Sequence, residues 1–242
     1  MDFIYKIINF QMRTAFINQL IKEARNNSSI FLIVGDLGFS VVEPFAKEFP
    51  DRFLNAGVAE QNMTGIAAGL AIEGYTVFTY SIGNFPTLRC MEQIRYDVCY
   101  HNLNVKIVAV GGGYSYGPLG ASHHATEELG MLRTIPNLTV CAPGDPVETS
   151  AITSLIANNN SPCYLRLGKA GEPTVHKNEI EIKFGKMVPI IEGKGTAILS
   201  TGSILKYSYD YVVNNKLILG LYSFSFIKPL DLDGLKKIAD NY

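Results

Sequence analysis

The sequence has 242 residues, of which 47% are hydrophobic and 18% charged, and its formal net charge is -1. A chain of this length can bury one full-sized core, with material left for part of a second. Lysine and arginine are scattered, so the basic surface that binds nucleic acid is not expected. The apolar runs are far shorter than the ~20 residues of a membrane helix.

The N-terminus does not have the pattern of a signal peptide. The four cysteines form no CxxC pair, which argues against a structural zinc site and a disulfide scaffold. We therefore expect a cytoplasmic protein that has neither nucleic acid nor a membrane as a partner.

Apolar residues follow two alternating patterns along the first two thirds of the chain. Helical periodicity appears first at residues 12–25, and Ile30–Val34 reads as a strand buried on both faces. Further helices are predicted at about 61–73, 87–100 and 125–134, and further strands at 75–80, 105–110, 138–141 and 163–166. Asp145 and Pro146 have the residue types of an N-cap and a first helical turn. This alternation predicts an α/β fold with a doubly wound, mostly parallel sheet.

The composition changes after residue 167. Residues 168–186 are charged and contain Gly and Pro, which predicts a linker between a first domain at 1–167 and a second at 187–242. The second domain has strands predicted at 196–200 and 217–221, and helices at 204–213 and from about 231. Because so few strands cannot close a full sheet, we expect a smaller, truncated α/β domain of marginal stability.

Short motifs occupy the loops and helices near the carboxyl ends of the predicted strands, where open parallel sheets bind their ligands. They are AGVAEQNM at 56–63 with the small residues that follow, EQIR at 92–95, GASH at 120–123, LRTIPN at 132–137 and PGDPVE at 143–148. Their order and their spread over nearly the whole chain resemble those of transketolases and 1-deoxyxylulose-5-phosphate synthases. The resemblance implies the pyrimidine-binding fold of thiamine-diphosphate enzymes, followed by part of the transketolase C-terminal domain.

Glu60 matches the catalytic glutamate of this family. The resemblance implies that its carboxyl group binds the aminopyrimidine of thiamine diphosphate and favours the imino tautomer, which deprotonates the thiazolium ring. An apolar pocket that favours the protonated carboxyl suits this task. Without its flanking motif, Glu60 reads equally well as a helix-capping residue. Phe85 matches the aromatic residue that stacks on the pyrimidine, with Ile82 and Leu88 along the same wall, although an aromatic residue after a strand is more often core.

Three further residues match substrate or cofactor positions of the family. His123 corresponds to the histidine that bonds substrate hydroxyls or assists proton transfer; the alternative is a surface histidine without a role. Lys169 stands where relatives carry a phosphate-binding arginine and can receive a phosphate as a point charge; it reads nearly as well as a solvated linker lysine. Asp36 falls in the segment that reaches the cofactor across a subunit interface. Leu119 replaces an aspartate that contacts a sugar hydroxyl, so the match does not extend to the usual pentose-phosphate substrates.

The Gly-Asp-Gly motif that holds metal and diphosphate in these enzymes is absent from the sequence. Met1 also stands directly before the pyrimidine-binding region. The resemblance therefore implies a split enzyme, in which a separate N-terminal subunit binds Mg²⁺ and the diphosphate of thiamine diphosphate. We expect no metal ligand in this chain, self-association, and a heterotetramer with two copies of each subunit.

Several activities stay open. The first is a transketolase-like transfer of a two-carbon ketol or related acyl unit between sugars or sugar phosphates, with the cofactor as electron sink. A 1-deoxyxylulose-5-phosphate synthase-like subunit and a 2-oxo acid dehydrogenase β subunit are alternatives, and the motifs at 132–137 and 143–145 favour transketolase over the latter. A non-catalytic assembly subunit is favoured by the short second domain and by Leu119, and disfavoured by the presence of Glu60, Phe85 and His123.

Overall fold

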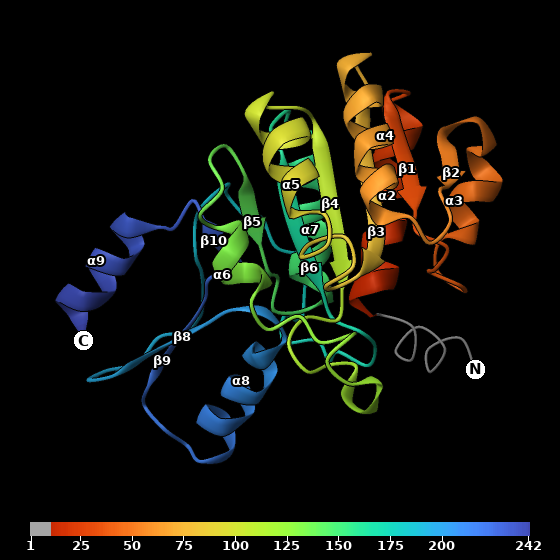
Figure 1. The fold of residues 1–242 in the computed structure, drawn as a ribbon. Coiled ribbons are helices and arrows are strands. Elements are labelled where there is room, and N and C mark those ends of the chain that lie inside the picture. The colour runs from red at the N-terminus through yellow and green to blue at the C-terminus, as the bar shows by residue number, and fades with distance from the viewer. Residues whose placement is uncertain (1–10) are drawn as a thin grey trace.

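The computed structural model describes residues 11–242 and contains two β-sheets (Figure 1). The large sheet has seven strands in the order β10-β5-β6-β4-β3-β1-β2, and the small sheet has three in the order β7-β9-β8. The strands are β1 (Ile30–Val34), β2 (Phe53–Asn55), β3 (Thr76–Ile82), β4 (Val105–Val110), β5 (Thr139–Cys141), β6 (Cys163–Leu167), β7 (Val188–Ile191), β8 (Ala197–Ser200), β9 (Gly220–Ser223) and β10 (Phe226–Lys228). All neighbours in the large sheet are parallel except β10 and β5. The predicted doubly wound, mostly parallel sheet with a smaller α/β unit is confirmed.

Helices cover both faces of the large sheet (Figure 1). On one face α2 (Met12–Asn26) and α7 (Pro146–Ala157) pack against alternate residues of β1, β3, β4 and β6. On the other face lie α4 (Glu60–Ile72), η2 (Ile94–Tyr100) and α6 (Glu128–Leu132). Because both faces are covered, the central strands are buried on both sides, and β4 is buried at all six positions.

Two predicted helices are shorter than the sequence pattern indicates. The segment predicted as a helix at 87–100 is helical only over α5 (Met91–Gln93) and η2, because Pro86 and a tight turn at Gly83 precede it. A Cβ at Gly83 would lie 2.9 Å from the carbonyl oxygen of Gly111. The helix predicted at 125–134 contains only α6, because Ala125 is held extended in an antiparallel bridge to Gly113.

Several elements have no clear signal in the sequence and were not predicted. They are the helices α3 (Glu43–Glu48) and η1 (Pro50–Arg52), and the strands β2, β7 and β10. The last predicted strand, 217–221, begins later, at β9. Each of the missed strands has three or four residues, which is too short for apolar alternation to stand out from a loop.

The C-terminal part contains η4 (Gly202–Ile204), α8 (Leu205–Asn214) and α9 (Leu232–Asn241) around the small sheet. Residues 168–187 contain no helix or strand, but the side chain of Ile182 is buried in the core beside α7. Strand β10 lies beyond this segment and nevertheless pairs with β5. The domain boundaries at 167 and 187 stay a prediction, and the C-terminal residues contribute one strand to the large sheet.

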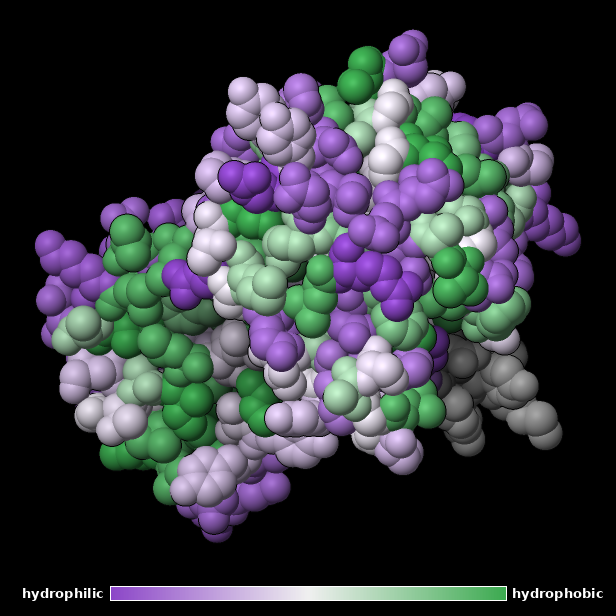
Figure 2. Space-filling view, viewed as in Figure 1, coloured by the Kyte–Doolittle hydropathy of each residue, from purple (hydrophilic) through white to green (hydrophobic). Residues whose placement is uncertain are grey.

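Apolar side chains gather on the surface of the C-terminal part, over β8 and β9 in the lower left of Figure 2. A hollow of about 450 Å³ there is lined mainly by apolar residues of α6, β8, α9 and the segment around β10. Exposed apolar patches of this kind are typical of surfaces that contact other chains or segments. Within residues 11–242, every helix is too short or too polar to cross a bilayer.

Candidate active site

Glu60 provides a buried carboxylate at the carboxyl ends of β1 and β3. It is the first residue of α4, and only 1% of its side chain is exposed. The hydroxyl of Ser81, in β3, donates a hydrogen bond of 3.2 Å to Glu60 Oε1. Gly35 follows β1 closely enough that a Cβ there would lie 3.5 Å from Glu60 Cγ. Small residues at the carboxyl ends of two neighbouring strands therefore lie against this side chain.

Arg89 completes the environment of Glu60 and was not predicted from the sequence. Its Nη1 donates to Glu60 Oε2 at 3.1 Å, while half of the arginine side chain stays exposed. Both hydrogen bonds to the carboxylate thus come from outside α4, which argues against the helix-capping interpretation. A single arginine in a turn shows no periodicity, and its position four residues after Phe85 was the only signal that could have pointed to it.

The Phe85 ring lies between Arg89 and His123. The guanidinium carbon of Arg89 is 5.2 Å from the centroid of the Phe85 ring, within the range of a cation–π contact. The rings of Phe85 and His123 meet edge to face with their centroids 5.1 Å apart. The structure therefore brings three residues, Glu60, Phe85 and His123, into one continuous group through Arg89.

The loop after β4 positions His123. Ser122 Oγ lies 2.9 Å from His123 Nδ1, and Asn84 Nδ2 donates to the Ser122 carbonyl oxygen at 2.7 Å. The bond from Asn84 connects the loop to the turn that carries Phe85. The ring orientation of His123 is thus set by its neighbours.

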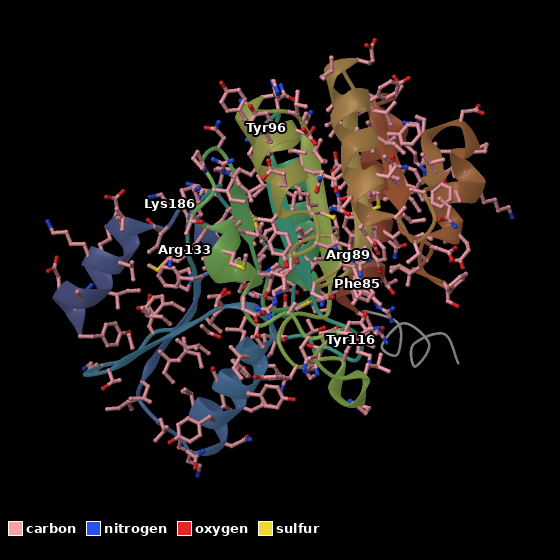
Figure 3. All side chains as sticks on the ribbon, viewed as in Figure 1. Phe85, Arg89, Tyr96, Tyr116, Arg133 and Lys186 are labelled. Carbon is pink, nitrogen blue, oxygen red and sulfur yellow. The ribbon has the colours of Figure 1, made fainter. Side chains whose placement is uncertain are left out.

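Tyr116 is a second residue that the sequence did not point to. Its ring centroid is 5.8 Å from that of His123, and burial raises the pKa of its hydroxyl. The ring packs against Gly111, where a Cβ would come within 2.3 Å of it, so this glycine makes room for the tyrosine. Arg89, Phe85 and Tyr116 lie at the same end of the large sheet, and Tyr96 lies at the opposite end (Figure 3).

Lys169 reaches the same group of side chains from the loop after β6. The residue is exposed, and its Nζ lies 4.8 Å from the centroid of the Tyr116 ring. Residues that follow β3, β4 and β6 therefore meet at one edge of the sheet. The role of Lys169 in phosphate binding stays a prediction.

The other three predicted cofactor residues lie on the same edge. Asp36 is exposed, and it exchanges two hydrogen bonds with Asn55 at 2.9 and 3.0 Å, which connect the loops after β1 and β2. Ile82 ends β3 and is half-buried, as is Leu88 in the following turn. Their contacts with a cofactor stay predictions.

The arrangement fits a flat heteroaromatic ring. Such a ring needs an aromatic face, which Phe85 offers, and a polar partner for its nitrogen, which Glu60 offers through Oε2. Residues 11–242 contain no cluster of three His, Cys, Asp or Glu side chains that could hold a metal ion. A large groove of about 780 Å³ lies elsewhere, between α2 and α7, and none of the predicted site residues lines it.

Comparison with known proteins agrees with this geometry. Residues 9–172 match the family described as "Transketolase, pyrimidine binding domain". The chain is 34% identical over 233 residues to one of the subunits of apulose-4-phosphate transketolase from Phocaeicola vulgatus, and the match covers 94% of this chain and 75% of that protein. It is 37% identical over 235 residues to a putative transketolase C-terminal section of Methanocaldococcus jannaschii, covering 95% of this chain and 74% of that protein.

A solved structure shares both fold and sequence with the chain. It is described as a split-gene transketolase in an inactive β4 tetramer, and it superimposes with a TM-score of 0.85 at 33% identity. The match covers 96% of this chain and 77% of the solved chain. The chain belongs to the transketolase family, and residues 9–172 form its pyrimidine-binding domain.

Proposed function

We propose that the chain is the pyrimidine-binding subunit of a thiamine-diphosphate-dependent, transketolase-like enzyme. The enzyme transfers a two-carbon ketol or related acyl unit between sugars or sugar phosphates. The observation that carries the proposal is the buried carboxylate of Glu60 beside the Phe85 ring, at the carboxyl edge of a parallel sheet. When bound, thiamine diphosphate supplies the electron sink for carbon–carbon bond cleavage and formation.

In this proposal, the residues of this chain bind and orient the pyrimidine of the cofactor and the substrate. Glu60 holds the ring nitrogen of the pyrimidine, and the hydroxyl of Ser81 keeps its carboxyl group in place. Phe85 stacks on the ring, with Ile82 and Leu88 beside it. His123 contacts substrate hydroxyls through Nε2, because Ser122 lies next to its other nitrogen.

We assign the diphosphate and Mg²⁺ to a separate, pyrophosphate-binding N-terminal subunit. This chain contains no Gly-Asp-Gly motif, and large apolar side chains are exposed in the loops around the carboxyl edge of the sheet, namely Phe39, Val58, Tyr114 and Leu119. Apolar residues in such a position favour a protein partner over solvent. Asp36 lies on the same side and would reach the cofactor across that interface.

The assembly we propose is a cytoplasmic heterotetramer with two copies of each subunit. The solved relative is described as an inactive β4 tetramer. A chain that self-associates but lacks activity without its partner agrees with that description.

We propose a sugar phosphate as the substrate class. Lys169 lies beside Tyr116, whose ring is next to that of His123, and its ammonium group can receive a phosphate there. The relative from Phocaeicola vulgatus is named for a phosphorylated sugar. Leu119 lies in the loop that carries His123, at the position of the family aspartate that contacts a sugar hydroxyl. The leucine side chain cannot make this contact with the substrate.

Calorimetric titration of thiamine diphosphate and Mg²⁺ tests the proposal. The titration is run into this chain alone, and then into its mixture with a candidate subunit that carries Gly-Asp-Gly. We expect tight binding only in the mixture, with a loss for Glu60→Gln and none for Glu73→Gln, an exposed position at the end of the same helix. Tight binding by this chain alone, or equal binding by Glu60→Gln, would contradict the proposed site. A lack of binding in both cases would favour a non-catalytic assembly subunit.

A further inference from the structure

We propose that a cavity at the carboxyl ends of β4, β5 and β6 binds a small oxyanion of the phosphate type, and that Arg166 is the residue that holds it. None of the residues assigned above to cofactor or substrate lines this cavity. The inference therefore goes beyond the proposed function and does not depend on it. It adds an anion site that is separate from the phosphate position proposed for Lys169.

The cavity lies where four loops meet, and its volume is about 190 Å³. Gly112 and Ser115 follow β4, Pro143 follows β5, residues 167–168 lie at the end of β6, and residues 201–204 follow β8. Pockets for drug-sized ligands occupy roughly 300–1,000 Å³, so this volume suits a small ion or a single phosphoryl group. The carboxyl ends of parallel strands are also where open α/β sheets bind their ligands.

The chemistry of the lining favours an anion. Arg166 is the fourth residue of β6, and 22% of its side chain is exposed. Among the described residues, the lining contains no Asp, Glu or Lys, so the guanidinium is its single charge. The hydroxyl groups of Thr201 and Ser203 also line the cavity and form no hydrogen bond with another side chain or backbone group of residues 11–242. A positive charge with free hydroxyl donors fits the oxygens of a phosphate.

Glu128 and the glycine loop after β4 hold the guanidinium in place. Nε of Arg166 lies 3.1 Å from Oε1 of Glu128, whose side chain is almost completely buried. A Cβ at Gly112 would lie 1.5 Å from Nε and 2.1 Å from Nη2, and a Cβ at Gly113 would lie 3.4 Å from Nη2. The guanidinium therefore packs against the backbone of two glycines while the ion pair fixes its Nε side.

The outer nitrogens of Arg166 stay available to a ligand. Neither Nη1 nor Nη2 forms a hydrogen bond within residues 11–242, and the shortest contact with Glu128 uses Nε. A guanidinium has five N–H donors, most of them on these two nitrogens. Because Arg166 lines the cavity, a phosphate there can accept from both Nη groups at once, which is the bidentate geometry that arginine favours.

The alternative is that Arg166 serves only to neutralise Glu128. A bidentate contact would serve that purpose best. Instead, both carboxylate oxygens of Glu128 lack a hydrogen bond from the described residues, although Nε is 3.1 Å from one of them. The ion pair thus positions the guanidinium and leaves its outer donors to the cavity.

A bound oxyanion would connect the two sheets. Arg166 belongs to the large sheet, whereas Thr201 and Ser203 follow β8 of the small sheet. A ligand that binds the folded chain and not the unfolded chain raises the unfolding temperature as its concentration rises. Phosphate should therefore stabilise the chain more than chloride does at the same ionic strength.

Calorimetric titration of inorganic phosphate into the full 242-residue chain tests the site, together with thermal unfolding at constant ionic strength. Arg166→Lys keeps a positive charge beside Glu128 but lacks the planar fork, and it should weaken phosphate binding about tenfold. Ser203→Ala removes one hydroxyl donor and should weaken it about threefold. If Arg166→Lys folds poorly, Arg166→Met combined with Glu128→Gln takes its place, since it removes both partners of the buried ion pair.

A parallel titration with glycerol phosphate identifies the source of the oxyanion. Tighter binding of glycerol phosphate than of inorganic phosphate would support the site with a phosphorylated metabolite as its ligand. Equal or weaker binding would support the site with free phosphate as its ligand. In both cases the loss of affinity in Arg166→Lys must be seen with the same probe.

Two further variants separate this site from other positive charges. Arg95→Met removes an exposed arginine in η2 and should leave phosphate binding unchanged. Lys169→Met should also keep the binding that Arg166→Lys loses. Absence of phosphate binding by the native chain, or native affinity in both Arg166→Lys and Ser203→Ala, would overturn the inference. Loss of binding in Lys169→Met with native affinity in Arg166→Lys would overturn it as well, because the anion would then occupy the position proposed for the substrate.

The proposed function fails or holds by a different measurement. It depends on thiamine diphosphate binding to the mixture of subunits and on its loss in Glu60→Gln. Phosphate binding by this chain alone has no part in that titration, so either hypothesis can be rejected while the other stands.

Discussion

His176 connects the segment after β6 to the start of α7 through a contact that should depend on pH. Its Nδ1 lies 3.0 Å from Asp145 Oδ2, and its Nε2 lies 3.8 Å from Glu148 Oε1. Only 10% of the imidazole is exposed, and both carboxylates are fully buried. We predict that replacement of His176 by glutamine destabilises the protein more at pH 6 than at pH 9.

The sign follows from the charges around the ring. Burial lowers the pKa of His176, but the hydrogen bond to Asp145 and the charges of Asp145 and Glu148 outweigh it and raise the pKa above 6.5. A raised pKa in the folded state means that the protonated ring stabilises the fold below the unfolded pKa of about 6.5. This contribution decreases as the pH rises through the folded pKa.

The magnitude follows from the type of bond. A hydrogen bond to a charged group contributes about 1.5–3 kcal/mol. At pH 6 both the imidazole and Asp145 are charged, which favours the upper end of this range, whereas at pH 9 only Asp145 is charged, which favours the lower end. Asp145 keeps its bonds from the backbone N–H groups of Val175 and His176 in the variant, so only the side-chain bond is lost. We expect a loss in unfolding free energy of about 3 kcal/mol at pH 6 and about 1.5 kcal/mol at pH 9.

Urea unfolding of the native chain and of His176→Gln, each at both pH values, measures this difference. His101→Gln, at an exposed position after η2, serves as the control and should change stability little. An equal loss at pH 6 and pH 9 would refute the reasoning, because the contact would then not involve the charged imidazole.

Two other substitutions test local features of the fold. Gly112→Ala should lower the unfolding free energy by about 1–3 kcal/mol in thermal or urea unfolding, because a Cβ there would lie 1.5 Å from Nε of Arg166. The control is Gly130→Ala in α6, where the added methyl group meets open space and should not lower the stability. Equal effects of the two substitutions would contradict the packing argument. Asp231→Ala should lower the unfolding free energy by about 1 kcal/mol, since this side chain accepts a hydrogen bond of 3.1 Å from the first turn of α9. Asp233→Ala, at an exposed neighbouring position, should lower it less. The reverse order would show that the cap contributes little.

The sequence alone determined the elements whose signals are local. The apolar run Val105–Val110 was predicted as a buried strand and is β4, and Asp145 with Pro146 was predicted to start a helix and caps α7. Backbone pattern and capping chemistry depend on a few adjacent residues, so they can be read without a structure. The motif around Glu60 likewise pointed to the family and to a carboxyl group that the structure buries.

The tertiary structure decided which side chains surround that carboxyl. Arg89 and Tyr116 lie 29 and 56 positions from Glu60 in the numbering, and neither residue type carries a pattern that predicts its neighbour. The same holds for β10, which pairs with β5 across more than 80 residues of intervening chain. Contacts of this kind form only when segments far apart in the chain meet in the folded sheet, and no local preference of the chain encodes that meeting.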